Sequence, residues 1–167
     1  MKRLVSDTGP ILHLREAGAL HRFPLIGNIF LPPLVMTELR FHLPALWSNA
    51  LPEWVGVHTL SSRAQQQSLS WRRAGILHIG EAEALALANQ IQPDWFLTDE
   101  AAARLVAESL GIEVHGSIGI VLWVAGQKLI SQTEAEKCLD GLEESSLWMS
   151  QKVRAAAREA LSKLTSG

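Results

Sequence analysis

Cysteine is nearly absent from the sequence, which contains only Cys138. A single thiol cannot form an intramolecular disulfide, and no cysteine or histidine stands at the spacing that a zinc site requires. We therefore expect Cys138 to be a buried apolar side chain, and we expect neither a disulfide framework nor a zinc centre.

Long apolar runs are also missing. The longest later stretch, residues 118–125, is far shorter than the roughly 20 residues that cross a bilayer. Near the N-terminus, Asp7 and the Gly9-Pro10 pair interrupt the first hydrophobic run, so this run does not resemble a secretory leader. These features predict a cytoplasmic protein without a membrane span.

The chain has no excess of positive charge, because its formal net charge is −2. It therefore lacks the overall basic field that drives nonspecific binding to nucleic acids. Basic residues gather locally at Arg63, Arg72 and Arg73. They are either the solvated face of a helix or contacts to phosphate groups.

The composition is that of a globular protein, with 47% hydrophobic and 19% charged residues and no low-complexity tract. A chain of 167 residues is long enough to bury the core of one domain. We therefore expect a single folded domain.

Short apolar runs alternate with segments whose apolar residues recur at helical spacing. We predict strands at residues 2–6, 28–31, 54–60, 95–98 and 112–115. We predict helices at 11–20, 34–40, 61–73, 81–91 and 100–110, and a helical remainder that includes 133–144 and 147–164. This alternation predicts an α/β fold of three layers, α/β/α, around a central parallel sheet of four to five strands. We assign residues 1–130 to this domain and residues 131–167 to a helical extension packed on it.

Four acidic residues follow or interrupt apolar stretches, where a carboxylate is costly unless it is paired or bound to a metal. They are Asp7 after the first strand, Glu38 in the second helix, Glu81 at the start of a later helix and Asp99 after the fourth strand. Parallel sheets bind ligands beyond the carboxyl ends of their strands. A cluster of carboxylates without partner lysines indicates a hard cation, Mg²⁺ or Mn²⁺.

Each acid also has a simpler interpretation. Asp7 and Asp99 can cap the helices that follow them, and Glu81 can interact with a helix dipole. Glu38 can be an ordinary surface residue. The joint placement of the four acids favours a common site.

Five segments together resemble the PIN-domain superfamily of metal-dependent nucleases, most closely a prokaryotic branch related to toxin–antitoxin ribonucleases. The segments are residues 5–11, 31–39, 80–84, 96–104 and 114–119. No single motif is specific, and the resemblance rests on their order and spacing.

The resemblance implies a ribonuclease whose acidic pocket binds one or two Mg²⁺ or Mn²⁺ ions, with water as the nucleophile. The pocket residues are Asp7, Glu38, Glu81 and Asp99. Hydroxyls beside the pocket orient a carboxylate or a water, or simply cap turns. They belong to Thr8, Thr98 and Ser117. The resemblance also suggests a toxin whose antitoxin protein covers the acidic groove, and we expect a homodimer.

Some assignments stay open in the sequence. Glu83 is an alternative to Glu81, since residues two apart on a helix face different sides, and Glu100 is an alternative to Asp99. Arg104 either steadies a carboxylate or is an ordinary surface residue. His13 and the other histidines are scattered without ligand spacing, so we expect them to be structural or exposed.

Trp123, in an apolar helical segment, would suit a dimer contact. The C-terminal helices at 133–144 and 147–164 are the expected partner surface, unless they pack only on the domain's own sheet.

Two other functions compete with the nuclease. The first is a PIN-like binding or regulatory module that cleaves nothing. The second is a phosphatase of the haloacid-dehalogenase type, whose mechanism needs a second aspartate where this chain has Gly9. A phosphate-binding loop is not supported, because neither a G-x-x-x-x-G-K-[ST] nor a G-x-G-x-x-G pattern follows a predicted strand.

Overall fold

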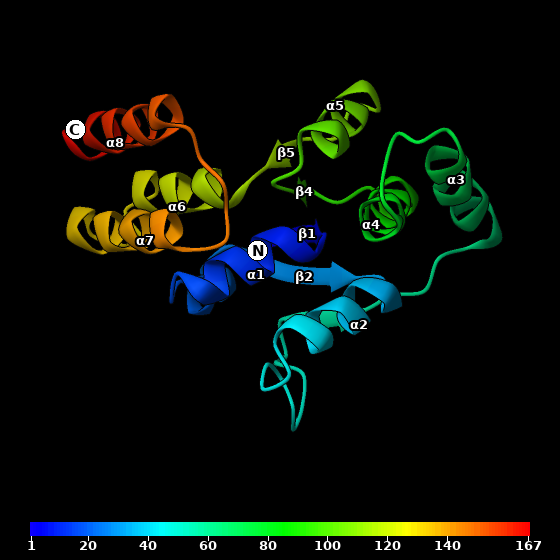
Figure 1. The fold of residues 1–167 in the computed structure, drawn as a ribbon. Coiled ribbons are helices and arrows are strands. Elements are labelled where there is room, and N and C mark those ends of the chain that lie inside the picture. The colour runs from blue at the N-terminus through cyan, green and yellow to red at the C-terminus, as the bar shows by residue number, and fades with distance from the viewer.

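Five parallel strands form one sheet in the order β3-β2-β1-β4-β5 (Figure 1). The computed structural model describes all 167 residues. The strands are β1 (Lys2–Ser6), β2 (Gly27–Leu31), β3 (Val55–Val57), β4 (Trp95–Leu97) and β5 (Val114–His115). β1 lies at the centre, where the strand order reverses direction.

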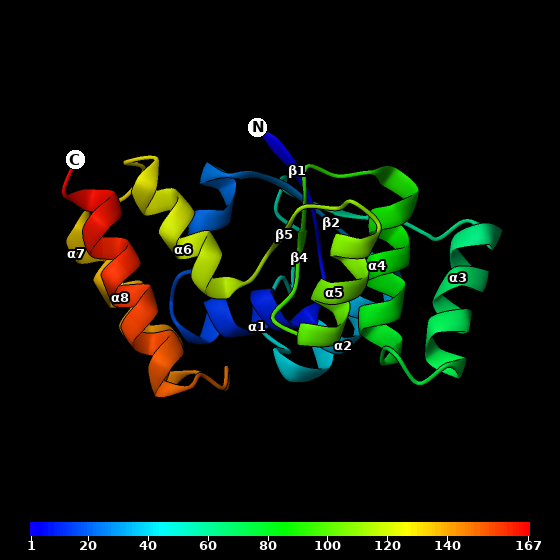
Figure 2. The same ribbon diagram turned by 90° about the horizontal axis from the view of Figure 1, so that it is seen from above.

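Helices cover both faces of the sheet, which confirms the predicted three-layer fold. They are α1 (Thr8–Glu16), α2 (Pro33–His42), α3 (Ser62–Arg73), α4 (Ile79–Ile91), α5 (Ala101–Ser109), α6 (Ser117–Gly126), α7 (Gln132–Glu144) and α8 (Gln151–Thr165), with a 3₁₀ helix, η1 (Leu20–Leu25). Figure 2 shows α1 and α6 on one side of the strands and α4 and α5 on the other. Helix α3 lies outermost beside α4, and α7 and α8 lie outermost beside α6.

The predicted helix at 11–20 is wrong at both ends. Helix α1 begins earlier, at Thr8, because the Asp7 side chain accepts a hydrogen bond from the Gly9 N–H at 3.2 Å and caps the helix. It ends at Glu16, just before Gly18, whose φ of 69° leaves the helical region. Leu20 instead begins η1.

The two edge strands are shorter than predicted. Strand β3 ends at Val57 rather than at residue 60, because it pairs only with β2 and its last partner there is Leu31. The chain turns into α2 directly after Leu31 through two prolines. Strand β5 begins at Val114 rather than at residue 112, opposite a three-residue β4.

The last helix begins later than the predicted residue 147. Ser150 caps α8 by accepting a hydrogen bond from the Val153 N–H at 3.2 Å, so residues 147–150 form a loop.

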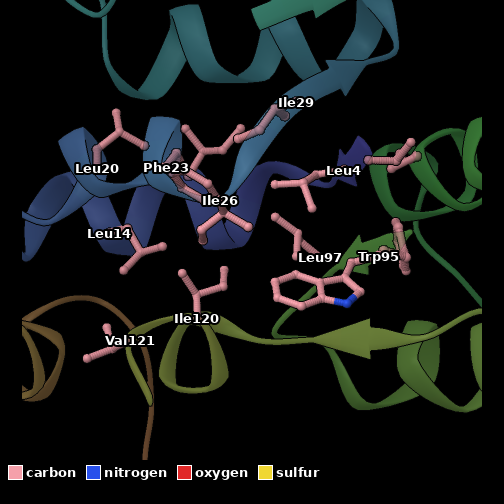
Figure 3. Close-up of a cluster of buried hydrophobic side chains, with 14 of the residues drawn as sticks. Leu4, Leu14, Leu20, Phe23, Ile26, Ile29, Trp95, Leu97, Ile120 and Val121 are labelled. Atoms are coloured by element: carbon pink, nitrogen blue, oxygen red, sulfur yellow. The ribbon is translucent and has the colours of Figure 1, made fainter. Parts of the chain in front are cut away.

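The hydrophobic core fills the space between the sheet and the helices. Figure 3 shows Leu4 and Leu97 of neighbouring strands close to Phe23 of η1 and Ile120 of α6, all fully or almost fully buried. Cys138 is buried and unpaired, as predicted.

Helices α7 and α8 pack against each other and against α6, and α7 also contacts α1. Trp123 of α6 is half-buried and packs edge to face on Trp95, with 5.0 Å between the ring centroids. The domain boundary at residue 131 and the dimer contact through Trp123 remain predictions. None of the helices combines the length and the apolar character needed to cross a bilayer.

We expect Leu4→Ala to lower the free energy of unfolding by about 2–5 kcal/mol, because it leaves a cavity in the central strand. The matched control is Leu105→Ala, since Leu105 is 67% exposed. Urea unfolding followed by circular dichroism measures both. Equal effects of the two substitutions would contradict the central position of β1 in the core.

Candidate active site

The pairing of β1 with β4 brings the first two site residues together. Ser6 lies opposite Leu97 in the parallel register, so Asp7 and Thr98 follow side by side at the carboxyl ends of these strands. The Asp7 N–H donates to the Leu97 carbonyl at 3.1 Å, and the Thr98 hydroxyl donates to Asp7 Oδ2 at 2.5 Å. The crevice beyond the carboxyl ends of β1 and β4 lies where the strand order reverses, and open parallel sheets usually bind their ligands at such a point.

Asp7 is a buried carboxyl group, only 3% exposed. Its pKa is raised well above the ordinary value, first because burial penalises the charged form and then because Asp99 and Glu81 repel its charge. Hydrogen bonds from Thr98 and Gly9 oppose this rise only in part. Two further carboxylates, those of Asp99 and Glu81, therefore repel the charge of Asp7.

Glu38 reaches the same place from α2. It accepts a hydrogen bond from the Thr8 hydroxyl, and its carboxylate lies directly against Gly80 at the start of α4. A β-carbon at Gly80 would stand 2.6 Å from both Glu38 carboxylate oxygens, so only glycine leaves room for them.

Glu81, the next residue, accepts a hydrogen bond from the His78 N–H at 3.1 Å. It therefore fulfils the simpler interpretation, an acid at a helix N-terminus, and still borders the site.

A cleft of ≈ 160 Å³ lies between these side chains, and none of its lining residues is hydrophobic. It is lined by Asp7, Thr8, Gly9, Glu38, His78, Gly80, Glu81 and Glu100. Three of the four predicted acids thus line one cleft. The fourth, Asp99, does not line it, whereas its exposed neighbour Glu100 does.

Asp99 lies beside this cleft and is held by its own partners. It accepts hydrogen bonds from the Ser117 N–H at 2.7 Å and the Ser117 hydroxyl at 2.6 Å. A β-carbon at Gly9 would lie 3.5 Å from Asp7 Oδ1 and 3.8 Å from Asp99 Oδ2, so the two aspartates border the same spot. Asp99 does not cap α5, whose N-cap residue is Glu100.

His13 is a site residue that the sequence did not reveal. Its Nδ1 lies 2.6 Å from Asp99 Oδ2, and the side chain is only 12% exposed. His13 is therefore structural, one of the two roles predicted for the histidines, and the acid that it contacts is one of the four predicted site residues. One sequence signal was available, because His13 stands four residues after Gly9 on the helix that Asp7 caps. His115 has a structural position, bonded to Glu113 at 2.8 Å and packed on Trp95.

Glu83 lies apart from the acidic cleft. It lines a groove of ≈ 550 Å³ between α2, α3 and α4, together with Arg72. Burial raises the pKa of Glu83, while the positive charge of Arg72 opposes the rise. Glu81 and Glu83 thus face different sides of α4. Arg63 and Arg73 are exposed on α3.

A family model for the PIN domain matches residues 3–163, which is nearly the whole chain. The chain belongs to the PIN-domain family. PIN domains are generally nucleases, so the fold is a nuclease fold. No curated protein matches the sequence.

The acidic cleft of this PIN domain has a donor set that suits a hard cation, because four carboxylates and the Thr8 hydroxyl line it and His78 is its one imidazole. No three histidine, cysteine or acidic side chains lie close enough to hold one ion together. Mg²⁺ keeps several waters and is commonly held by only one or two carboxylates. The residues therefore fit a largely hydrated ion beside the buried Asp7.

We expect Asp7→Asn to stabilise the metal-free protein near neutral pH. Below the ordinary pKa of 3.8, Asp7 is protonated in both the folded and the unfolded chain. As the pH rises, the unfolded chain loses its proton first, so the folded state loses stability until the pH exceeds the raised pKa. Asparagine stays neutral and can still cap α1.

The effect is measured by recording melting temperatures between pH 7 and pH 3.8 in the presence of a chelator. The difference between Asp7→Asn and wild type should be positive near pH 7 and shrink as the pH falls toward 3.8. Glu108→Gln is the control, because Glu108 is exposed and forms no ion pair. A less stable Asp7→Asn protein at neutral pH would show that Asp7 carries no electrostatic strain.

Proposed function

We propose that this PIN domain is a Mg²⁺- or Mn²⁺-dependent endoribonuclease that hydrolyses phosphodiester bonds of RNA. The observation that carries the proposal is the buried Asp7 carboxyl group, repelled by Asp99 and Glu81 at the edge of a wholly polar cleft. Such a group is costly to ionise without a compensating positive charge. A dication supplies that charge.

In this proposal Asp7, Glu38, Glu81 and Asp99 hold the ion, directly or through its waters. When bound, the ion lowers the pKa of a water molecule and offsets negative charge on the phosphoryl oxygens.

The chain's own hydroxyl groups fix the carboxylates in place. Thr98 holds Asp7 Oδ2, which leaves Oδ1 toward the cleft with only the Gly9 N–H as partner. Thr8 holds Glu38 from the adjacent residue. Because the acids are oriented in advance, little reorganisation is needed when the phosphate arrives.

Ser117 and His13 hold Asp99 in the same way, from α6 and α1 respectively. Asp99 therefore keeps one orientation beside Asp7, and side chains from two helices and from the end of β4 support Asp7, Glu38 and Asp99. This support is the pattern expected of a site whose ligands must be placed accurately.

Several finer assignments rest on the sequence patterns and on the family resemblance. We propose that the protein acts in the cytoplasm as a homodimer, and that it is the toxin of a toxin–antitoxin pair whose antitoxin covers the acidic cleft. We also propose that residues 131–167 form the helical extension of the nuclease domain.

A catalytically inactive PIN-like binding module is the second candidate. One observation favours it, since no three acidic side chains already lie within reach of one ion. The two candidates differ in whether metal ions bind at Asp7 and whether RNA is cleaved.

We expect wild-type protein to cleave single-stranded RNA when Mn²⁺ or Mg²⁺ is added and to be inactive in a chelator. Asp7→Asn should reduce the rate by at least about a hundredfold, because even changes in residues that only support metal ligands cost 10- to 100-fold. Glu108→Gln, at an exposed residue that does not line the acidic cleft, should cleave at the wild-type rate. Gel analysis of a labelled RNA measures the rates.

Metal binding is measured separately from cleavage. Mn²⁺ should raise the melting temperature of the wild type, because an ion that binds only the folded state stabilises it, and Asp7→Asn should abolish this rise. A wild type that neither shifts nor cleaves is the inactive module.

We expect Gly80→Ala to lower the metal-dependent cleavage rate by about 10- to 100-fold, because displacing a site group by about 1 Å has an effect of this order. The new β-carbon would stand 2.6 Å from the Glu38 carboxylate oxygens and push that side chain away. The fold should survive, since the obstructed atoms are the end of a flexible side chain. Gly126→Ala is the matched control, because Gly126 does not line the acidic cleft and its β-carbon meets nothing closer than 3.4 Å. Equal rates for the two variants would exclude Glu38 from the site.

A further inference from the structure

A second cavity of ≈ 370 Å³ adjoins the acidic cleft, and the proposed chemistry does not use it. One wall of the cavity is formed by the end of β5 and the start of α6. The opposite wall is the loop that joins α7 to α8. Asp99 belongs to its wall, while Asp7, which borders the same spot as Asp99, belongs to the acidic cleft. The two hollows are therefore neighbours across Asp99.

Arg104 supplies a positive charge without an ion-pair partner in this cavity. Its side chain is half-buried, yet it forms no ion pair and donates no hydrogen bond. A β-carbon at Gly116 would lie 3.1 Å from Arg104 Nη2 and 2.8 Å from Asp99 Oδ1, so the guanidinium group stands close to Asp99 without pairing with it. A partly desolvated guanidinium group with free donors is suited to bind an anion such as phosphate.

The start of α6 forms another part of the cavity wall. Its N-cap residue Gly116 and the first-turn residues Ile118 and Gly119 line the cavity. The Ser117 N–H between them is already bonded to Asp99, so Arg104 supplies the free donors of this cavity.

Trp148 provides an aromatic surface at the rim. Its side chain is 84% exposed, which is unusual for so large an apolar group. The residues on either side are anchored, because Met149 is buried and Leu147 packs against the core. Ser150 then caps α8. The loop is held at both sides, so the indole ring is presented outward from a fixed backbone.

We propose that this cavity is a nucleotide subsite of the nuclease, in which Trp148 stacks on a base of single-stranded RNA and Arg104 binds a phosphate that neighbours the acidic cleft. The proposal rests on the proposed nuclease function. An unpaired base offers a stacking face, whereas a base within a duplex does not. Because the acidic cleft repels phosphate groups, an adjoining cation helps to bring the strand to it.

The groove on the other side of the acids is less suited to this role. Its cation, Arg72, lies beside Glu83, whose pKa it lowers, so its charge is already partly compensated. No tryptophan or phenylalanine lines that groove.

Binding is measured by fluorescence anisotropy of a 5′-labelled, mixed-sequence single-stranded RNA of eight nucleotides, with Mg²⁺ present. All proteins carry Asp7→Asn, so that the RNA stays intact. We expect Trp148→Ala to weaken binding by about tenfold, the usual effect of losing one stacked base. Arg104→Ala should also weaken binding, and it should lower the slope of log Kd against log salt by about 0.7, the value for one phosphate of a single strand. Trp148→Ala should leave the slope unchanged.

The matched controls are Phe41→Ala and Arg15→Ala. Phe41 is 80% exposed and lines neither hollow, and Arg15 is an exposed cation without an ion pair. Both should bind RNA as the parent does. Thermal melts check that every variant is folded, and the exposure of Trp148 makes its loss harmless to the core.

The subsite and the nuclease activity can fail separately. If Trp148→Ala and Arg104→Ala bind RNA within twofold of the parent, or if the parent binds no RNA, the subsite is wrong and the cavity is left to a protein partner. If the subsite variants lose affinity as expected but wild type cleaves no RNA in Mn²⁺, the subsite stands and the nuclease proposal fails.

Discussion

The parallel pairing of β1 with β4 is the constraint on which the site depends. It sets Ser6 opposite Leu97, and the next residue of each strand then enters the crevice where the sheet reverses its strand order. Asp7 and Thr98 meet there by register alone, before any helix is considered. A shift of the register would separate them, and because β1 is buried on both faces such a shift would also disrupt the core.

The site combines burial with repulsion, and this combination opposes stability. Asp7 is buried at the cleft, and its pKa is raised. The Thr98 hydroxyl and the Gly9 N–H nevertheless keep its carboxyl group oriented. Proteins commonly place such unfavourable charges at functional sites, where a ligand offsets the cost. The cluster of buried hydrophobic side chains around β1 supplies the stability that tolerates it.

Much of the fold and part of the site were accessible from local patterns. The five strands, the parallel sheet and the proximity of Asp7 to Asp99 follow from hydrophobic periodicity and from acids placed at strand ends. The errors in the first helix and the edge strands came from caps and partners that a local pattern does not show. The choice between Glu81 and Glu83 could not be made from the sequence, because it depends on how α4 is rotated about its axis. In the structure Glu81 lines the acidic cleft, whereas Glu83 lies beside Arg72.

The sequence by itself determined the alternation of strands and helices and the oxygen-rich chemistry of the acids, because these depend on residue types and short spacings. Only the tertiary structure decided that His13 contacts Asp99, 86 residues away, that Asp99 stands beside the acidic cleft rather than in its lining, and that Arg104 and Trp148 share a cavity. Contacts between distant segments depend on how the helices pack on the sheet, and that packing is set by the whole core rather than by any local stretch of the chain.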